Sequence, residues 1–211
     1  YRANRARAEA LQRAMREQFA AELTLVEGDI EEKETRQRYL VATGGAPEAV
    51  AVFPGDPARV KMEELDREAM LRSLEANFVG PTLLARELGA AMEQTGGGSV
   101  VLLATMQAMA AFSGSLNYGP AKAALVHAAR VLAKEWKRVR VNVVAPGATV
   151  AGMAETSVSA GKYDSFVESG AITRFGRPED VARAVRFFLE PDNYVTGQVL
   201  VVDGGLTVAR L

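Results

Sequence analysis

The stretch that decides the fold runs from residue 100 to residue 147 and reads "VVLLATMQAMAAFSGSLNYGPAKAALVHAARVLAKEWKRVRVNVVAPG". It begins and ends with apolar runs, "VVLLA" and "VRVNVVAPG", and a helical segment rich in alanine, valine and leucine lies between them. Solid apolar runs that alternate with helices are typical of parallel strands covered on both faces. The stretch therefore predicts an α/β fold around a parallel sheet.

The same alternation continues on both sides of this stretch. Apolar residues at three- and four-residue spacings predict helices, and short apolar runs predict strands. We expect helices at 4–22, 31–42, 63–92 and 178–190, and strands at 23–29, 48–53 and 197–205. No linker interrupts the pattern, so residues 1–211 are expected to form a single doubly wound domain.

The composition excludes several classes of function. The 25 basic and 26 acidic residues nearly cancel, which leaves no electrostatic reason to expect a nucleic acid or a membrane surface as partner. The chain has no cysteine, so disulfides, thiolate metal sites and cysteine nucleophiles are excluded, and no metal is expected. No apolar run is long enough to cross a bilayer and no signal peptide opens the chain, so a cytoplasmic location is expected by default.

Tyr118 and Lys122 form the first candidate site. Four residues apart on a helix, they share one face, so the ammonium group can lie beneath the phenol ring. A nearby positive charge favours phenolate, and we expect it to lower the pKa of Tyr118 toward neutrality, where general acid–base catalysis works best. The hydroxyl of Thr105, which follows "VVLLA", could hold a substrate carbonyl oxygen against that phenol. Hydride would have to come from a bound cofactor, because no side chain supplies it.

These residues also match a known pattern. Thr105, twelve intervening residues and then "YGPAK" resemble the signature of the short-chain dehydrogenase/reductase family, in which a serine precedes a Tyr-x-x-x-Lys motif. Further segments resemble that family in the same order: "EANFVGP", "VRVNVVAPGATVAGM", "RFGRPEDVARAVRFFL" and "YVTGQVLVVDGG". Tyr-x-x-x-Lys by itself is more often a surface pair, but together with Thr105 and the Pro-Gly turn it is better explained as a site. The resemblance extends along the whole chain and implies a Rossmann-type fold.

The resemblance implies a catalytic set of four residues. Tyr118 would act as general acid or base, Lys122 would lower its pKa and bind the ribose of the cofactor, and Thr105 would polarise the substrate carbonyl. Asn77, which interrupts the helix expected at 63–92, would hold a water that relays protons to Lys122. The alternative role for Asn77 is a structural hydrogen bond to the backbone. His127, the only histidine, is assigned a structural role.

The resemblance also implies where a nicotinamide cofactor would bind. Tyr1 holds the position where the family reads the adenosine ribose with an acidic residue, and Arg2 follows it, which favours NADP over NAD. Asp29 and the backbone of Ile30 correspond to contacts with the adenine edge. The residues assigned to the cofactor are Arg2, Asp29, Ile30, Gly55, Tyr118, Lys122, Pro146, Gly147 and Thr149.

The sequence departs from the family pattern in three places near the expected site. Thr105 replaces the catalytic serine and keeps its hydroxyl, so activity should survive. The family's "NNAG" motif falls on "VFPG", residues 52–55, where only Gly55 is retained. Ala151 replaces a threonine that often holds the carboxamide, and the backbone of Thr149 would take over that contact.

The largest departure is at the start of the chain. The glycine-rich turn that receives the pyrophosphate is absent, together with the first strand, which in this topology lies in the middle of the sheet. Unpaired backbone groups in the core would each cost on the order of 1–3 kcal/mol. Because the chain also begins with tyrosine rather than methionine, we expect that the given sequence omits an N-terminal segment, or that another segment fills the gap.

The sequence therefore predicts an NADPH-dependent oxidoreductase that interconverts a small carbonyl compound and a secondary alcohol, with a general resemblance to 3-oxoacyl-acyl-carrier-protein reductases. The alternative is a degenerate family member that keeps the fold and serves as a binding or regulatory subunit. The resemblance also implies a homotetramer or a homodimer. The segment 150–173 is expected to cover the substrate, and Gln107, Met109 and Met153 are candidate pocket walls.

Overall fold

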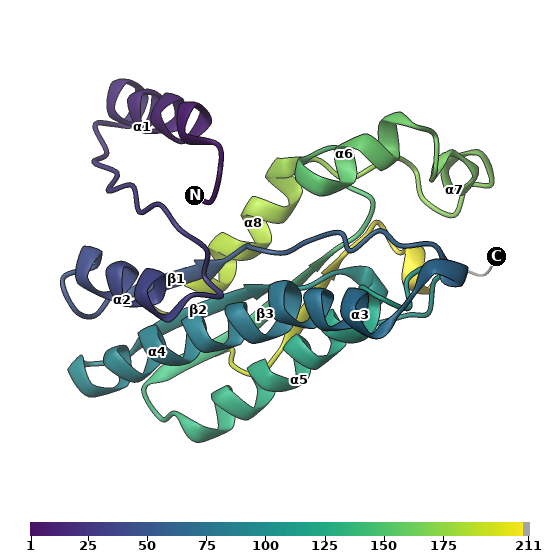
Figure 1. Ribbon diagram of the computed structural model, residues 1–211. Coiled ribbons are helices and arrows are strands. Elements are labelled where there is room, and N and C mark those ends of the chain that lie inside the picture. The colour runs from purple at the N-terminus through teal and green to yellow at the C-terminus, as the bar shows by residue number, and fades with distance from the viewer. Residues whose placement is uncertain (209–211) are drawn as a thin grey trace.

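The computed structural model describes residues 1–208, without the side chains at positions 153, 154, 156 and 157. Its centre is a sheet of four parallel strands in the order β1-β2-β3-β4 (Figure 1). The strands are β1 (Ala49–Val52), β2 (Gly98–Leu103), β3 (Val139–Pro146) and β4 (Val199–Val202). The register pairs Val100 with Val141 and Val144 with Leu200. The expected α/β fold with a parallel sheet is confirmed.

Helices and short turns connect these strands. The helices are α1 (Arg5–Phe19), α2 (Lys33–Ala42), α3 (Arg67–Leu74), α4 (Gly80–Thr95), α5 (Gly119–Glu135), α6 (Gly152–Ser159), α7 (Asp164–Glu168) and α8 (Pro178–Leu189). The shorter turns are η1 (Met62–Glu64), the π-helical η2 (Glu75–Val79), η3 (Met106–Ala108) and η4 (Leu206–Val208). In the part of the chain that the structure describes, no helix is long and apolar enough to span a membrane.

The core lies on both faces of the sheet because successive strand residues point in opposite directions. Leu102 faces the helices α4 and α5 and belongs to a cluster with Leu88 and Leu125. Its neighbour Val101 faces the opposite side and packs with Phe188 of α8. Burial on both faces explains why β2 is apolar along its length rather than alternating.

The segment 23–29, expected to form a strand, lies outside the sheet, which corrects the sequence-based prediction. Two backbone hydrogen bonds connect this segment to Tyr1. The Tyr1 amino group donates to Val26 O at 2.8 Å, and the Tyr1 carbonyl accepts from Gly28 N at 3.0 Å. Within residues 1–208, no strand pairs with the second edge of β1. In the described part of the chain β1 is therefore an edge strand, and the apolar run 23–29 pairs with no strand of the sheet.

The helix α1 stands apart from the sheet (Figure 1). None of its residues is buried, and Phe19 at its end is 67% exposed. Its N-terminus is nevertheless well formed, because the side chain of Asn4 accepts a hydrogen bond from Arg7 N at 3.0 Å. The helix α1 is thus stabilised by its N-terminal cap and by its own sequence, and not by burial in the core.

The helix expected at 63–92 is interrupted in its middle. It begins as α3, where the side chain of Asp66 accepts a hydrogen bond from Ala69 N at 2.7 Å, and it continues as α4 after the π-helical turn η2. Such turns are uncommon and occur frequently at functional sites. Asn77 lies in this turn and is completely buried.

Candidate active site

The predicted site residues gather where the strands end. Gly55 follows β1, Thr105 follows β2, and Pro146 and Gly147 close β3. Because all four strands are parallel, their carboxyl ends share one edge of the sheet, which is where ligands bind in open α/β folds. The topology therefore brings together residues that are about 90 positions apart in the sequence.

Tyr118 lies at the N-terminus of α5, next to the turn that carries Thr105. A Cβ atom on Gly119 would lie 2.9 Å from the carbonyl oxygen of Gln107, so only glycine allows α5 to begin this close to η3. The hydroxyl oxygen of Thr105 accepts a hydrogen bond from Gln107 N at 3.3 Å and caps the same turn. The close contact between Gly119 and Gln107 therefore keeps Tyr118, which precedes Gly119, near the turn that Thr105 caps.

Lys122 is buried at the end of β2 rather than exposed beside Tyr118. Only 2% of its surface is exposed, and its Nζ donates to Leu103 O at 3.0 Å and to Pro54 O at 3.4 Å. Burial lowers the pKa of Lys122 to about 8, because the apolar surroundings disfavour the charged form. Its two carbonyl partners still favour the ammonium ion at neutral pH.

The phenol of Tyr118 does not have the lowered pKa expected from its spacing to Lys122. Burial raises the pKa of Tyr118 to about 12, and the charges of Tyr163 and Asp56 act in the same direction. The expectation was wrong because residue spacing does not report desolvation, which here dominates the pKa of Tyr118. In this state Tyr118 is a protonated phenol at neutral pH.

Gly55 and Asn77 complete the neighbourhood of Lys122. A Cβ atom on Gly55 would lie 2.9 Å from Asn77 Oδ1 and 3.1 Å from Lys122 Nζ, so this position requires glycine. The side-chain oxygen of Asn77 accepts a hydrogen bond from Asp56 N at 2.9 Å, and its amide donates to Ser73 Oγ at 3.3 Å. Asn77 is therefore hydrogen-bonded to the backbone of the loop after β1, which is the structural role that the sequence analysis gave as the alternative to a proton relay.

The Pro-Gly turn after β3 lies against the turn that Thr105 caps. A Cβ atom on Gly147 would lie 2.7 Å from the backbone of Asp203 and 3.4 Å from the sulfur of Met106. The hydroxyl of Thr149 is buried and donates to Gly147 O at 3.2 Å. Pro146, Gly147 and Thr149 thus lie on the same side of the site as Met106.

Arg2, Asp29 and Ile30 form a second group, at the start of the chain. Arg2 Nη1 lies 3.1 Å from Asp29 Oδ2, and the Arg2 side chain remains 66% exposed. Arg36, which the sequence-based reasoning missed, fixes the adjoining backbone: it is buried, donates to Ile30 O at 2.7 Å, and pairs with Glu87 at 3.2 Å. A charged residue in a helix gave no sequence signal for this role.

Ser73 and Asn117 were also missed. The hydroxyl of Ser73 donates to the carbonyl oxygen of Asn117, and Asn117 Nδ2 donates to Ala58 O at 3.1 Å. Their sequence signal was weak but present, since Ser73 lies one helical turn before Asn77 and Asn117 directly precedes Tyr118. His127, in contrast, is exposed on α5.

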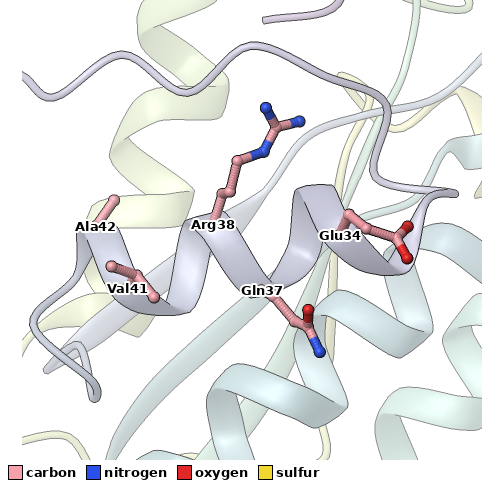
Figure 2. A pocket seen from close by; sticks show the side chains of 5 residues that line it. All are labelled: Glu34, Gln37, Arg38, Val41 and Ala42. Carbon is pink, nitrogen blue, oxygen red and sulfur yellow. The ribbon is translucent and has the colours of Figure 1, made fainter.

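The hollows on the described surface include one along α2 and one at the start of α5. The larger, of about 590 Å³, lies along α2 between Glu34 and Ala42 and includes none of the predicted site residues (Figure 2). The smaller, of about 520 Å³, is lined by Gln107 and Met109 together with the start of α5. Gln107 and Met109 are therefore pocket walls as expected, whereas the side chain of Met153 lies outside the described residues. The chemistry of the site favours the smaller hollow as the relevant one, because it adjoins the turn capped by Thr105.

Comparison with known proteins identifies the family of this chain. A family model described as "Enoyl-(Acyl carrier protein) reductase" matches residues 2–207, nearly the whole chain. The chain belongs to the short-chain dehydrogenase/reductase family. The matched range contains every residue that the sequence assigned to the site.

Individual members of the short-chain dehydrogenase/reductase family are similar over much of the chain. A human protein named "3-oxoacyl-[acyl-carrier-protein] reductase" is 39% identical over 141 residues, which cover 66% of this chain and 57% of that protein. An "NAD-dependent glycerol dehydrogenase" of Listeria innocua is 30% identical over 151 residues, 70% of this chain and 59% of that protein. The chain thus spans less than two thirds of the length of these relatives.

A solved structure of a short-chain dehydrogenase/reductase from Mycobacterium ulcerans has the same fold. It superposes with a TM-score of 0.88 at 26% sequence identity, and the alignment covers 98% of this chain and 79% of that one. The likeness confirms that the four-stranded sheet is part of a Rossmann-type sheet.

Proposed function

We propose that this protein is an NADPH-dependent oxidoreductase that interconverts a carbonyl compound and a secondary alcohol, with Tyr118 as general acid or base. The observation that carries the proposal is the burial of Lys122 beside Gly55 and Asn77, at the strand ends where Tyr118 begins α5. A buried ammonium ion is costly, and such groups are commonly kept for function.

The residues present fit a nicotinamide cofactor. Gly55 has no Cβ, so the loop after β1 lies directly against Lys122 Nζ and Asn77 Oδ1 and brings a short stretch of backbone close to both polar groups. Lys122 would hold the ribose, and Pro146, Gly147 and Thr149 would line the nicotinamide end. Arg2, Asp29 and Ile30 would bind the adenosine end. The bound cofactor would supply or accept the hydride, which no side chain can do.

The protonation state of the site suits reduction of a carbonyl. The raised pKa of Tyr118 keeps its proton at neutral pH, so the phenol can donate that proton to the substrate oxygen. The oxygen of Thr105 already accepts from Gln107 N, which leaves the hydroxyl hydrogen free to polarise the same carbonyl. Lys122, positively charged at neutral pH, would favour the phenolate that remains.

The substrate class, cofactor preference and assembly are inferred from the relatives and from exposed side chains. The human relative's name supports a 3-oxoacyl thioester or a similar ketone as substrate. The exposed guanidinium of Arg2 supports NADP, although the Listeria relative is named as NAD-dependent. Half-exposed apolar residues such as Val131 on α5 support assembly into a homotetramer or homodimer. No comparison supports a degenerate, noncatalytic member.

The test is titration of the full-length protein with NADPH, followed by nicotinamide fluorescence, and then NADPH oxidation with ethyl acetoacetate as a 3-oxoacyl probe. We expect saturable binding and oxidation that depends on the ketone. Absence of NADPH and NADH binding would overturn the proposed function. Binding without reduction of this probe or of simpler ketones would overturn the assignment of a carbonyl substrate.

A further inference from the structure

A closed circuit of hydrogen bonds connects the loop after β1 with the residue before Tyr118. On one side, Asp56 N donates to Asn77 Oδ1 at 2.9 Å, and Asn77 Nδ2 donates to Ser73 Oγ at 3.3 Å. Ser73 Oγ then donates to Asn117 O, and Asn117 Nδ2 donates to Ala58 O at 3.1 Å. Ala58 N donates back to the Asp56 carboxylate at 2.7 Å, which closes the circuit.

Three of the four side chains in this circuit are removed from water, and Asp56 is partly buried. Ser73 is 2% exposed, Asn77 is completely buried and Asn117 is 8% exposed. The Ser73 hydroxyl is the central element, because it accepts from Asn77 and donates to Asn117 at the same time. Without it, a buried amide and a buried carbonyl would both lose their partner, and neither could reach water.

The circuit holds a backbone conformation that does not form readily by itself. Ala58 has a φ of 48°, in the left-handed region that residues other than glycine seldom adopt. The Asn117 amide binds the carbonyl of this residue, and the Asp56 carboxylate binds its N–H. The loop 55–58 is thus held by its own Asp56 together with Asn117, which precedes α5, and Asn77 in η2.

Two members of the circuit are sequence neighbours of predicted site residues. Asn117 directly precedes Tyr118, and Asp56 directly follows Gly55, which lies beside Lys122. A shift of α5 along its axis would move Tyr118, and a shift of the loop would move Gly55. The circuit thus links these two positions through hydrogen bonds within the protein.

We propose that Ser73 is a positioning residue that keeps Tyr118 in register with the loop 55–58 through Asn117 and Asn77. The inference rests on the proposed function of Tyr118, but its structural part concerns only the circuit. It assigns Ser73 a role in the rate of the reaction and not in the binding of substrate or cofactor.

The experiment compares Ser73→Ala with a matched control, Ser99→Ala, in the full-length protein. Ser99 is also buried, with 1% of its surface exposed, and its hydroxyl likewise donates to a backbone carbonyl, Phe188 O at 2.7 Å, away from the site. Both variants therefore lose one buried hydroxyl of the same kind. Ser73→Thr keeps the hydroxyl, and Asn117→Ala breaks the circuit at another point.

Two measurements are made on each variant. The first is backbone hydrogen exchange in a peptide that covers residues 54–58, which is far from Ser73 in sequence. The second is steady-state reduction of ethyl acetoacetate with NADPH, with kcat and both KM values determined separately.

For Ser73→Ala and Asn117→Ala we expect faster exchange at 54–58 and a kcat at least about tenfold lower, because small misplacements of reacting groups are costly. Both KM values should change less than about threefold. Ser99→Ala should change neither measurement, and Ser73→Thr should recover kcat to within about threefold of the original.

Unchanged exchange at 54–58 in Ser73→Ala would overturn the inference, and so would a kcat equal to that of Ser99→Ala. If the original protein reduces no ketone, the proposed function fails, and the exchange measurement decides the inference alone. Faster exchange than in Ser99→Ala then supports the coupling, and equal exchange overturns it.

Discussion

The ammonium group of Lys122 lies 3.0 Å from the carbonyl oxygen of Leu103, the last residue of β2. The cation therefore binds the carboxyl end of a central strand, with almost no access to solvent. Burial of this kind is unfavourable for folding, because two carbonyl groups replace the hydration of the ammonium ion only in part. The pKa of Lys122 is lowered for the same reason, because burial disfavours the charged form of the amine.

Lys122→Met should reveal this cost as a pH-dependent difference in stability. The pKa of Lys122 is about 8 in the folded protein against an ordinary value of 10.5, so between these pH values the unfolded chain binds more protons. The free energy of unfolding of the original protein, relative to Lys122→Met, should therefore rise by about 3 kcal/mol from pH 8 to pH 10.5. Urea unfolding at a series of pH values measures this difference.

Lys134→Met provides the control for that experiment, because Lys134 is exposed in the last turn of α5. Its stability should follow that of the original protein across the same pH range. Parallel curves for Lys122→Met and Lys134→Met would contradict a buried cation at Lys122.

Tyr118→Phe should abolish ketone reduction while the protein stays folded. Removal of a positioned proton donor lowers kcat by roughly 10²–10⁴-fold. Within the described residues no hydrogen bond to the Tyr118 hydroxyl is found, so the variant should unfold at nearly the same temperature. Tyr39→Phe removes another partly buried phenol, outside the site, and should keep full activity. A Tyr118→Phe variant that reduced ketones at the original rate would exclude Tyr118 as the acid.

Arg2→Gln should shift the cofactor preference from NADPH toward NADH. The guanidinium pairs with Asp29 and is still mostly exposed, so it can also bind a 2′-phosphate. Loss of one charge-assisted hydrogen bond should weaken NADPH binding about tenfold and leave NADH binding nearly unchanged. Fluorescence titrations with both cofactors measure the ratio. Arg5→Gln, which breaks an exposed pair with Glu9, is the control. An equal loss for both cofactors would argue against phosphate recognition by Arg2.

Glu93→Gln should destabilise the turn before β3 in a pH-dependent way. The Glu93 carboxylate accepts from Arg138 N at 2.9 Å and from Lys137 N and Val139 N at 3.1 Å each. Desolvation acts to raise the pKa of Glu93, but these donors lower it overall. The stabilisation is therefore present above the ordinary pKa of a glutamate and is lost as the pH falls through the lowered value.

The melting temperature of Glu93→Gln should be lower than that of the original protein at pH 7, and the two should converge in acid. Glu17→Gln, at an exposed position of α1, should not change it. A constant difference between Glu93→Gln and the original protein at all pH values would show that shape rather than charge matters at this turn.

Periodicity predicted the strands β1 to β4 and most helices, because burial of one or both faces leaves a repeating apolar pattern. It failed at 23–29, where the residues have the composition of a strand but pair with no strand of the described sheet. It also gave one long helix where η2 interrupts the segment, although Asn77 marked the position correctly.

The sequence by itself determined the parallel sheet, the family, and the arrival of Thr105, Tyr118 and Lys122 at one edge of the sheet. These features can be predicted from the order of apolar and polar residues along the chain and from the common direction of parallel strands. Only the tertiary structure decided that Tyr118 stays protonated and that Ser73 binds Asn117, 44 positions further along the chain. Desolvation and long-range hydrogen bonds depend on which atoms exclude water from one another, and that is settled by packing rather than by sequence spacing.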